Sequence, residues 1–304
     1  MDFSRISLRT DFVKSAASLG DCVACRSSLS FFGPRKGYSY ARCKECGTLQ
    51  LSPYPTREEL DRAYTEDYAS SGHYGTNPEA IFLAAAPFYR ALLGELQRTR
   101  RPDGPVLDFG CGWGGMLRYL RDAGIPYLGI DFESESLSYC RKLGLDVRAG
   151  TLDSIPALDR KFGAVLLSAV FEHLINHREI MKNLGRVLLP GGLVIILIPT
   201  ASLFTLLGAL ALRLGAKELP ALHSAFVPPW HTTIFSLSGA RQVIAESGFC
   251  VERVIVSPSG TADGAFRVVQ LIATVVAQTG FSLFGERWPL APNHILICRK
   301  ENGL

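Results

Sequence analysis

The sequence has little net charge, no low-complexity tract and no internal repeat. Its 32 basic residues oppose 28 acidic ones, and the Lys and Arg residues are scattered along the 304-residue chain. Proteins that bind nucleic acid usually gather basic residues into a patch, so nucleic acid is not favoured as a substrate. The 47% of hydrophobic residues are typical of a globular protein. Because domains commonly have about 100–200 residues, the length predicts a large domain with an accessory module.

The first 20 residues lack the apolar central stretch of a secretory signal. Asp2, Arg5, Arg9, Asp11 and Lys14 stand among single apolar residues there. A secretory signal needs an uninterrupted apolar run after its basic start. We therefore expect a cytoplasmic protein.

One stretch, Leu189–Leu212, lacks charged residues altogether and is long enough to cross the roughly 30 Å hydrocarbon layer of a membrane. Pro190, Gly191, Gly192 and Pro199 interrupt it. We predict a buried strand, a turn and an apolar helix there, and no transmembrane span. Peripheral contact with a membrane surface stays open.

Four of the eight cysteines form two C-x2-C pairs, Cys22 with Cys25 and Cys43 with Cys46. Two such pairs can place four thiolates at the corners of the tetrahedron that zinc accepts. Four protein ligands close the coordination shell, so the predicted Zn²⁺ is structural. The alternative, two disulfides, is disfavoured in a reducing cytoplasm.

Residues 1–52 are accordingly predicted to form a zinc-ribbon-like module. Ser30–Arg42, between the pairs, is expected to be a hairpin that turns around Gly33 and Pro34. The other cysteines are isolated and predicted to be small core residues; they are Cys111, Cys140, Cys250 and Cys298.

Residues 53–100 are predicted to be a linker and a helical lead-in. Tyrosines follow Pro53, and they either cover a bound ligand or anchor the linker on the core. Ser70–Gly75 is expected to be a mobile loop, and apolar residues at helical spacing predict a helix over Pro78–Arg100. The tyrosines concerned are Tyr54, Tyr64, Tyr68 and Tyr74.

From residue 101 to residue 304, short apolar runs alternate with amphipathic helices, a pattern typical of a parallel sheet covered on both faces. Val106–Phe109 is the first predicted strand. It leads into the glycine-rich segment Gly110–Gly115 and a helix over Met116–Ala123. Glycines at the carboxyl edge of such a sheet let the backbone approach a ligand closely.

This glycine pattern alone also fits a nicotinamide or flavin dinucleotide. Asp108, at the strand end just before the loop, favours a different ligand, because a carboxylate repels a pyrophosphate and attracts an ammonium and a sulfonium. Asp131, at the end of the next strand, Tyr127–Ile130, suits the ribose hydroxyls. Its alternative role is to cap the helix Ser134–Leu143.

The series of motifs resembles the class I S-adenosylmethionine-dependent methyltransferases. VLDFGCGWG resembles their first motif and Gly129-Ile130-Asp131 their second. Gly150-Thr151-Leu152 resembles the loop that packs on adenine, and Phe162–Leu174 resembles the fourth strand with its E-H-L ending. LLPGGLVIILIPT resembles the strand that follows a P-G-G turn. The resemblance implies a doubly wound, Rossmann-like α/β fold with a seven-stranded, mostly parallel sheet.

The resemblance also implies an S-adenosylmethionine site. Asp108 would lie near the amino acid end of the cofactor, Asp131 on the ribose and Leu152 against adenine. Phe132 is a second adenine wall or an ordinary core aromatic. The implied cofactor residues are Asp108, Gly110, Cys111, Gly112, Gly114, Asp131, Phe132, Thr151, Leu152 and Ser168.

Two segments carry candidate catalytic residues. Glu172 and His173 follow the fourth strand, and either His173 acts as a base or the pair braces the turn. In related ubiquinone-pathway O-methyltransferases such a pair belongs to a metal-binding set with another acid three positions earlier. Ala169 stands there, which argues against a catalytic metal. His231, in an element that resembles the family's P-x-H-x-x-x-F-S, is a base, an orienting donor or a structural histidine.

The expected reaction is methyl transfer to an oxygen or carbon of a small-molecule or glycan-type acceptor, including a lipid-linked one. Nitrogen is less favoured because the D/N-P-P-Y type of signature is missing. Apolar insertions near residues 201–226 and 264–285 are expected to roof the acceptor pocket. The alternatives are a ribosomal RNA methyltransferase, which the weak basic character disfavours, and a non-catalytic protein that binds the cofactor or a partner through the zinc module.

Overall fold

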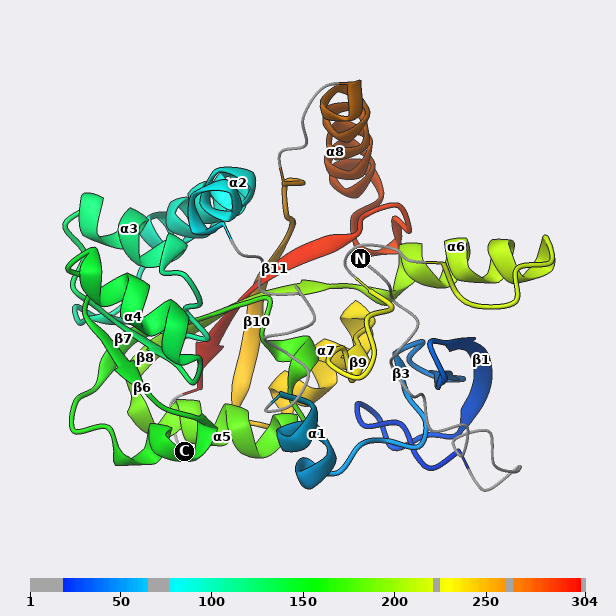
Figure 1. Ribbon diagram of the computed structural model, residues 1–304, viewed down its shortest axis with the longest axis horizontal. Coiled ribbons are helices and arrows are strands. Elements are labelled where there is room, and N and C mark those ends of the chain that lie inside the picture. Colours follow the sequence, from blue (N-terminus) through cyan, green and yellow to red (C-terminus); the bar gives the residue numbers. More distant parts are fainter. Residues whose placement is uncertain (1–18, 65–76, 221–224, 261–264, 302–304) are drawn as a thin grey trace.

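The computed structural model describes residues 19–64, 77–220, 225–260 and 265–301 (Figure 1). At its centre lies a seven-stranded sheet in the order β10-β11-β8-β7-β4-β5-β6. Neighbouring strands from β8 to β6 are parallel, and β11 is antiparallel to both its neighbours. The predicted Rossmann-like, mostly parallel fold is confirmed. The strands are β4 (Val106–Phe109), β5 (Tyr127–Asp131), β6 (Val147–Ala149), β7 (Phe162–Ser168), β8 (Leu188–Pro199), β10 (Phe249–Val256) and β11 (Asn293–Lys300).

Helices cover both faces of this sheet. The reason lies in the strands, because alternate side chains of a strand point to opposite faces. In β7, Ala164 and Leu166 belong to one core cluster, whereas Val165 and Leu167 belong to the other. The first cluster packs on α2 (Pro78–Arg98), α3 (Gly115–Asp122) and α4 (Ser134–Lys142), and the second packs on α5 (His177–Val187) and α7 (Leu237–Ala245).

A second, four-stranded sheet forms the N-terminal module. Its order is β1-β2-β3-β9, from β1 (Leu29–Arg35), β2 (Tyr38–Cys43), β3 (Leu49–Leu51) and β9 (Thr233–Ile234). The fourth strand therefore comes from a distant part of the chain, just before α7. The module and the Rossmann-like domain therefore share this sheet, an arrangement that the spacing of the cysteine pairs did not indicate.

The predicted hairpin is present, but its turn was placed wrongly. Gly33 and Pro34 lie within β1, paired with Tyr40 and Ser39, and the chain reverses at Lys36-Gly37. The φ angles of Lys36 and Gly37 are 47° and 77°. Two-residue hairpins favour turns in which both central residues have positive φ, because the twist of such a turn matches that of the strands.

The uncharged stretch Leu189–Leu212 forms the buried strand β8 and the helix α6 (Ala201–Arg213), as predicted. Residues 193–199 of β8 are buried between the two layers of helices. The remaining elements are the helices α1 (Arg57–Ala63) and α8 (Ala265–Phe284) and the 3₁₀ turns η3 (Leu152–Ala157), η4 (Phe171–His173) and η5 (Gly285–Arg287). The predicted mobile loop Ser70–Gly75, with Tyr68 and Tyr74, lies outside the described residues.

Candidate active site

A cavity of about 1120 Å³ opens at the carboxyl ends of β4, β5 and β7. Parallel α/β sheets bind ligands at this edge. The cavity extends from the glycine loop past η4 to the start of α5 and is bounded on the outer side by α1 and α2. It brings together most residues that the sequence nominated: Asp108, Gly110, Cys111, Gly112, Asp131, Phe132, Thr151, Ser168, Glu172, His173 and His231.

The carboxylate of Asp131 organises the glycine loop. Its Oδ2 accepts a hydrogen bond from the backbone N–H of Gly112 at 2.8 Å, and its Oδ1 accepts from Phe132 at 2.8 Å and from Glu133 at 3.1 Å. Glu133, not Asp131, caps α4, so the alternative role of Asp131 as that helix cap is wrong. The glycines are required, because Gly110 and Gly112 have φ of 76° and 50°.

Asp108 lies on the floor of the cavity, with 2% of its surface exposed. Its Oδ1 has no hydrogen-bond partner among the described residues. Burial, and secondarily the charge of Asp131, raises the pKa of Asp108 to about 7. A buried carboxyl group without a partner, facing a cavity, fits a cationic ligand.

The contacts predicted for two other cofactor residues stay predictions. Gly114, with φ of 73°, begins α3, and a Cβ there would collide with Cys140 and Leu145. It permits close packing of α3 on α4 and is not among the residues that line the cavity. The side chain of Leu152 lies outside the described part of the structure, so its predicted contact with adenine stays a prediction.

Glu172, His173 and His231 come together on one side of the cavity, with one potential ligand atom of each within 4.8 Å of the others. The ring centroids of His173 and His231 are 4.6 Å apart, and the planes are nearly perpendicular. Burial raises the pKa of Glu172 to about 8, and its Oε2 has no hydrogen-bond partner among the described residues. The two separate catalytic candidates of the sequence therefore form one cluster.

The protonation of His231 is determined by a backbone carbonyl. Its Nδ1 lies 2.8 Å from the oxygen of Ala225, and because a carbonyl only accepts, Nδ1 carries the proton. The ring is 6% exposed. In the neutral ring, the lone pair is then on Nε2, the form that a general base requires.

The segment that carries His231 is bound to η4. The N–H of Thr232 donates to the carbonyl of Glu172 at 3.0 Å, and its hydroxyl donates to the carbonyl of Leu174 at 2.7 Å. These bonds hold the loop of His231 against the E-H-L turn. The two histidines thus meet although 58 residues separate them in sequence.

The N-terminal module supports the same segment from the other side. The buried hydroxyl of Tyr40 donates to the carbonyl of His231 at 3.2 Å, and the N–H of Leu51 donates to the carbonyl of Thr232 at 2.9 Å. The hydroxyl of Tyr54 lies 2.8 Å from that of Thr233. Tyr54 is therefore an anchor of the linker, one of the two roles considered for these tyrosines.

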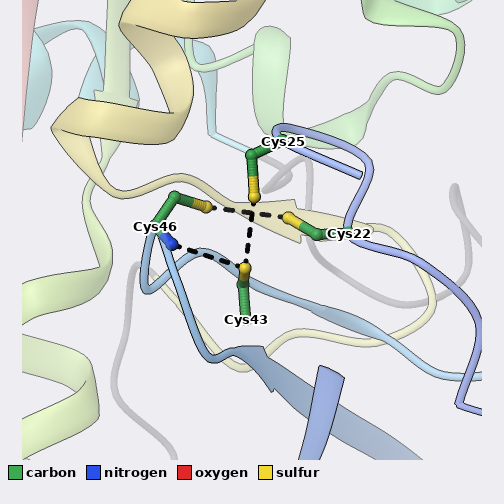
Figure 2. A group of neighbouring side chains, drawn as sticks. All are labelled: Cys22, Cys25, Cys43 and Cys46. Carbon is green, nitrogen blue, oxygen red and sulfur yellow. Dashed lines mark hydrogen bonds between the residues drawn. The ribbon is translucent and has the colours of Figure 1, made fainter. Parts of the chain in front are cut away.

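The four paired cysteines meet at one end of the module (Figure 2). Their sulfur atoms lie within 4.8 Å of one another, with Cys22 and Cys46 at 3.7 Å and Cys25 and Cys43 at 3.3 Å. None of them forms a disulfide. A zinc ion bound by four thiolates at about 2.3 Å requires sulfur separations of about 3.8 Å. The cluster is therefore compatible with zinc, as predicted from the spacing.

Sequence reasoning missed the contacts of two cavity residues in or next to α1. Tyr64, at the end of α1, places its hydroxyl 3.0 Å from Nδ1 of His173 and its ring against Phe132. Arg57, on the same helix, donates to Asp153 at 3.0 Å. No sequence signal links these pairs, because their members lie between 68 and 109 positions apart in the chain.

The apolar helices α6 and α8 were expected to roof the cavity, and this prediction is wrong. None of their described side chains lines it. Figure 1 shows both helices projecting from the body of the protein, away from α1 and the glycine loop. The cavity is instead bounded by α1, by α2 and by the start of α5, because these elements border the carboxyl edge of the sheet.

Comparison with known proteins decides the family. Residues 82–254, more than half of the chain, match a methyltransferase domain family. The chain is a class I S-adenosylmethionine-dependent methyltransferase. The match contains the glycine loop, Asp131 and the cluster of Glu172, His173 and His231, and it ends before α8.

The curated relatives include O-methyltransferases. The chain is 35% identical over 94 residues to a fatty-acid O-methyltransferase of Mycolicibacterium smegmatis, covering 29% of this methyltransferase and 34% of the relative. It is 31% identical over 144 residues to a malonyl-[acyl-carrier protein] O-methyltransferase of Pseudescherichia vulneris, covering 47% and 49%. The methyltransferase thus spans about half or less of the length of the curated relatives it matches.

Among solved structures, the methyltransferase resembles 1,6-didemethyltoxoflavin-N1-methyltransferase of Burkholderia thailandensis in complex with 1,6-didemethyltoxoflavin and S-adenosylhomocysteine. The TM-score is 0.53 at 16% sequence identity, and the match covers 87% of this chain and 96% of the other. At that identity, the similarity establishes the fold.

Replacing Asp131 by Ala is expected to weaken S-adenosylhomocysteine binding at least about 100-fold. The change removes the acceptor of three backbone hydrogen bonds and the acceptor predicted for the ribose hydroxyls, and each hydrogen bond to a charged group contributes about 1.5–3 kcal/mol. Isothermal titration calorimetry measures the change. Asp146→Ala, at an exposed carboxylate that precedes β6 and does not line the cavity, is the control and should bind normally. Unchanged affinity in Asp131→Ala would place the ribose elsewhere.

Binding of the cationic cofactor is expected to depend on pH through Asp108. Below its pKa of about 7 the carboxyl group is protonated and cannot pair with a cation, and above it the carboxylate can. The affinity for S-adenosylmethionine should therefore rise roughly tenfold between about pH 6 and pH 7.5. Calorimetry at several pH values tests this, and Asp108→Asn should remove the dependence. The same slope in wild type and variant would rule out Asp108 as its origin.

Proposed function

We propose that this methyltransferase transfers a methyl group to an oxygen or a carbon of a small-molecule, glycan-type or lipid-linked acceptor, with His231 as the general base. The observation that carries the proposal is the cluster of Glu172, His173 and His231, which lies in the same cavity as Asp108 and the glycine loop. A base assists transfer to a hydroxyl or an acidic carbon, whose proton must leave. An already nucleophilic sulfur or neutral amine needs this assistance less.

The residues of the cavity fit S-adenosylmethionine. Asp131 would accept from the ribose hydroxyls, Gly110 and Gly112 allow a close approach of the backbone, and Asp108 supplies a negative charge for the cationic end. When bound, the cofactor supplies a methyl group that its sulfonium has already activated. The enzyme chiefly has to hold the acceptor in line and exclude water, and such positioning is worth about 7–11 kcal/mol.

His231 is favoured over His173 as the base because of its hydrogen bonding. The carbonyl of Ala225 holds the proton on Nδ1, which orients the ring and leaves Nε2 as the basic atom. His173 is instead engaged by the hydroxyl of Tyr64 at Nδ1 and stands edge-on to His231. Its proposed role is to orient the acceptor. Glu172, protonated at neutral pH because its pKa is near 8, adds no charge that would repel an anionic acceptor oxygen.

The small-molecule or lipid-linked acceptor is supported by two observations. The cavity continues beyond the glycine loop along apolar side chains of α1 and α2, among them Leu60, Ile81 and Phe88. Two of the relatives are named for fatty-acid and acyl-carrier-protein acceptors. The formal charge of +4, without a basic run, gives RNA little attraction.

We further propose that residues 1–52 bind one structural zinc ion through Cys22, Cys25, Cys43 and Cys46. The support is the convergence of the four sulfur atoms without a disulfide. The role that we propose for the zinc-bound module is to fix the position of the base. The hydrogen bonds from β3 and Tyr40 to the segment of His231 support this role.

The experiment is a transfer assay with methyl-labelled S-adenosylmethionine and a fractionated extract of the source cell. Label is expected in the small-molecule or lipid fraction, in material that ribonuclease does not degrade. Label confined to the RNA fraction would contradict the proposed acceptor class. If no fraction is labelled although the cofactor binds normally, the proposed activity is contradicted and a non-catalytic role is favoured.

A further inference from the structure

Helix α8 exposes an unusual amount of apolar surface. Eight large apolar side chains between residues 268 and 284 are more than 40% exposed. They include Leu271 at 64% and Ile272 at 58%. Residues 268–287 are long and apolar enough to cross a membrane. An 18-residue stretch of this helix has a mean hydropathy of 1.6, and 11% of that stretch is buried.

The ordinary explanations for such a helix do not apply. A core helix of a soluble protein would be mostly buried, and a signal sequence would lie near the N-terminus. At 100° per residue, the exposed side chains from Val268 to Val276 cover an arc of about 160°. The apolar stripe by which a surface helix packs on its own core is about 100° wide and faces inward. In α8 the wide apolar face points to solvent.

The inner side of α8 is attached to the protein. Ala277 is buried, and the ring of Phe281 lies 5.2 Å from that of His294 in β11. The hydroxyl of Thr274 donates to that of Ser259, in the segment that follows β10, at 2.9 Å. These contacts fix one side of α8 on the protein, from which the helix projects (Figure 1). Its outer face therefore points in a fixed direction.

We propose that α8 inserts its outer face into one leaflet of a lipid bilayer and so places the methyltransferase on a membrane surface. Residues 268–285 contain no Asp, Glu, Lys or Arg, and charged residues bound them, Arg267 on one side and Glu286 and Arg287 on the other. An uncharged stretch between charged residues matches the profile of a membrane surface, where hydrocarbon borders on polar headgroups. The proposal concerns the location of the enzyme and is independent of its reaction.

The connectivity of α8 makes it an interfacial helix and excludes a membrane span. Val256, at the end of β10, pairs with His294 in β11, so both ends of α8 connect to neighbouring points of one sheet. A helix of 20 residues is about 30 Å long. If it spanned the bilayer, the eight residues between Val256 and Ala265 would have to return through hydrocarbon, and eight residues are too few for a helix of about 30 Å.

A second copy of the chain suits this surface less well than lipid. A helix that pairs with one partner helix uses a seam narrower than an ordinary amphipathic stripe. A single pairing would leave much of the 160° arc in water. Lipid chains adapt to the whole arc, and the absence of charge over 18 residues deprives a protein partner of ion pairs.

The test is flotation of the full-length, zinc-loaded protein with vesicles of phosphatidylcholine and phosphatidylglycerol. The wild type is expected to float with the vesicles. Ile272→Glu/Val275→Glu introduces two charges at exposed positions without removing core contacts, and should reduce the bound fraction at least about tenfold. The charge-matched control is Phe31→Glu/Leu214→Glu, at exposed apolar positions outside α8, and it should float like the wild type.

Binding of S-adenosylhomocysteine, measured on all three proteins, verifies that they are folded. The proposal is overturned if the folded wild type does not float, or if the α8 variant floats as well as the control. It is also overturned if wild type fails to bind vesicles and sediments as a dimer that Ile272→Glu/Val275→Glu converts to a monomer. In that case α8 packs on a second copy.

Discussion

Loss of the metal is expected to unfold the N-terminal module. Binding of zinc to small thiolate modules supplies about 10–16 kcal/mol of apparent folding free energy, which equals or exceeds the 5–15 kcal/mol that stabilises a typical domain. Cys43→Ser removes one of the four ligands of the cluster. The variant should lose its zinc, measured by mass spectrometry, and the amides of β1 to β3 should lose protection against hydrogen exchange.

The same loss is expected to abolish methyl transfer while S-adenosylhomocysteine still binds. The segment of His231 takes hydrogen bonds from Tyr40 and Leu51 of the module, whereas the glycine loop packs on the sheet face whose core cluster, with α2, α3 and α4, contains no residue of the module. Cys250→Ser is the matched control, because Cys250 is exposed and lies outside the cluster. If zinc-free Cys43→Ser keeps protected β1–β3 amides and full activity, the module does not depend on a structural metal.

Replacing His231 by Asn is expected to slow methyl transfer about 10²–10⁴-fold, the usual contribution of a general base. Asn keeps a donor for the carbonyl of Ala225 but has no group that accepts a proton near neutral pH. The affinity for S-adenosylhomocysteine should change little. The rate is measured with the acceptor that the labelled-transfer screen identifies. The rise of rate with pH that a general base produces is expected in the wild type and should be absent from the variant.

His294→Asn is the control for this substitution. His294 is also buried and hydrogen-bonded through Nδ1, to Thr200 at 2.8 Å, but it does not line the cavity. Its replacement should leave the pH profile unchanged. If His231→Asn retains both the wild-type rate and its pH dependence, the base is another group or none is needed.

The cofactor edge of the fold was predictable because its signals are local. The strand Val106–Phe109 was placed without error, and the positive φ of Gly110 and Gly112 explains why glycines follow it. The position of Asp131 follows from the same short unit of strand, helix and strand, at whose end it lies. The packing of Gly114 was not predictable, because a glycine that permits packing against Cys140 has the same sequence appearance as one that approaches a ligand.

The catalytic edge was less predictable because it depends on contacts between distant segments. Glu172 and His231 were nominated singly, and their proximity results from hydrogen bonds of Thr232 across about 60 residues. The strand β9 has two residues and pairs with β3 across about 180 positions, so no periodicity reveals it. Tyr64 was noticed as a tyrosine of the linker, but its contact with His173 is a product of tertiary structure.

Calorimetric titration with S-adenosylhomocysteine and, in parallel, with the dinucleotide NAD tests the central claim most directly. The glycine loop accepts either ligand by its backbone alone, and Asp108 distinguishes them because it opposes a pyrophosphate and attracts an ammonium. We predict one molecule of S-adenosylhomocysteine bound per chain and no binding of NAD. Binding of NAD, or of neither ligand, would contradict the assignment of the cavity as a methyl-donor site.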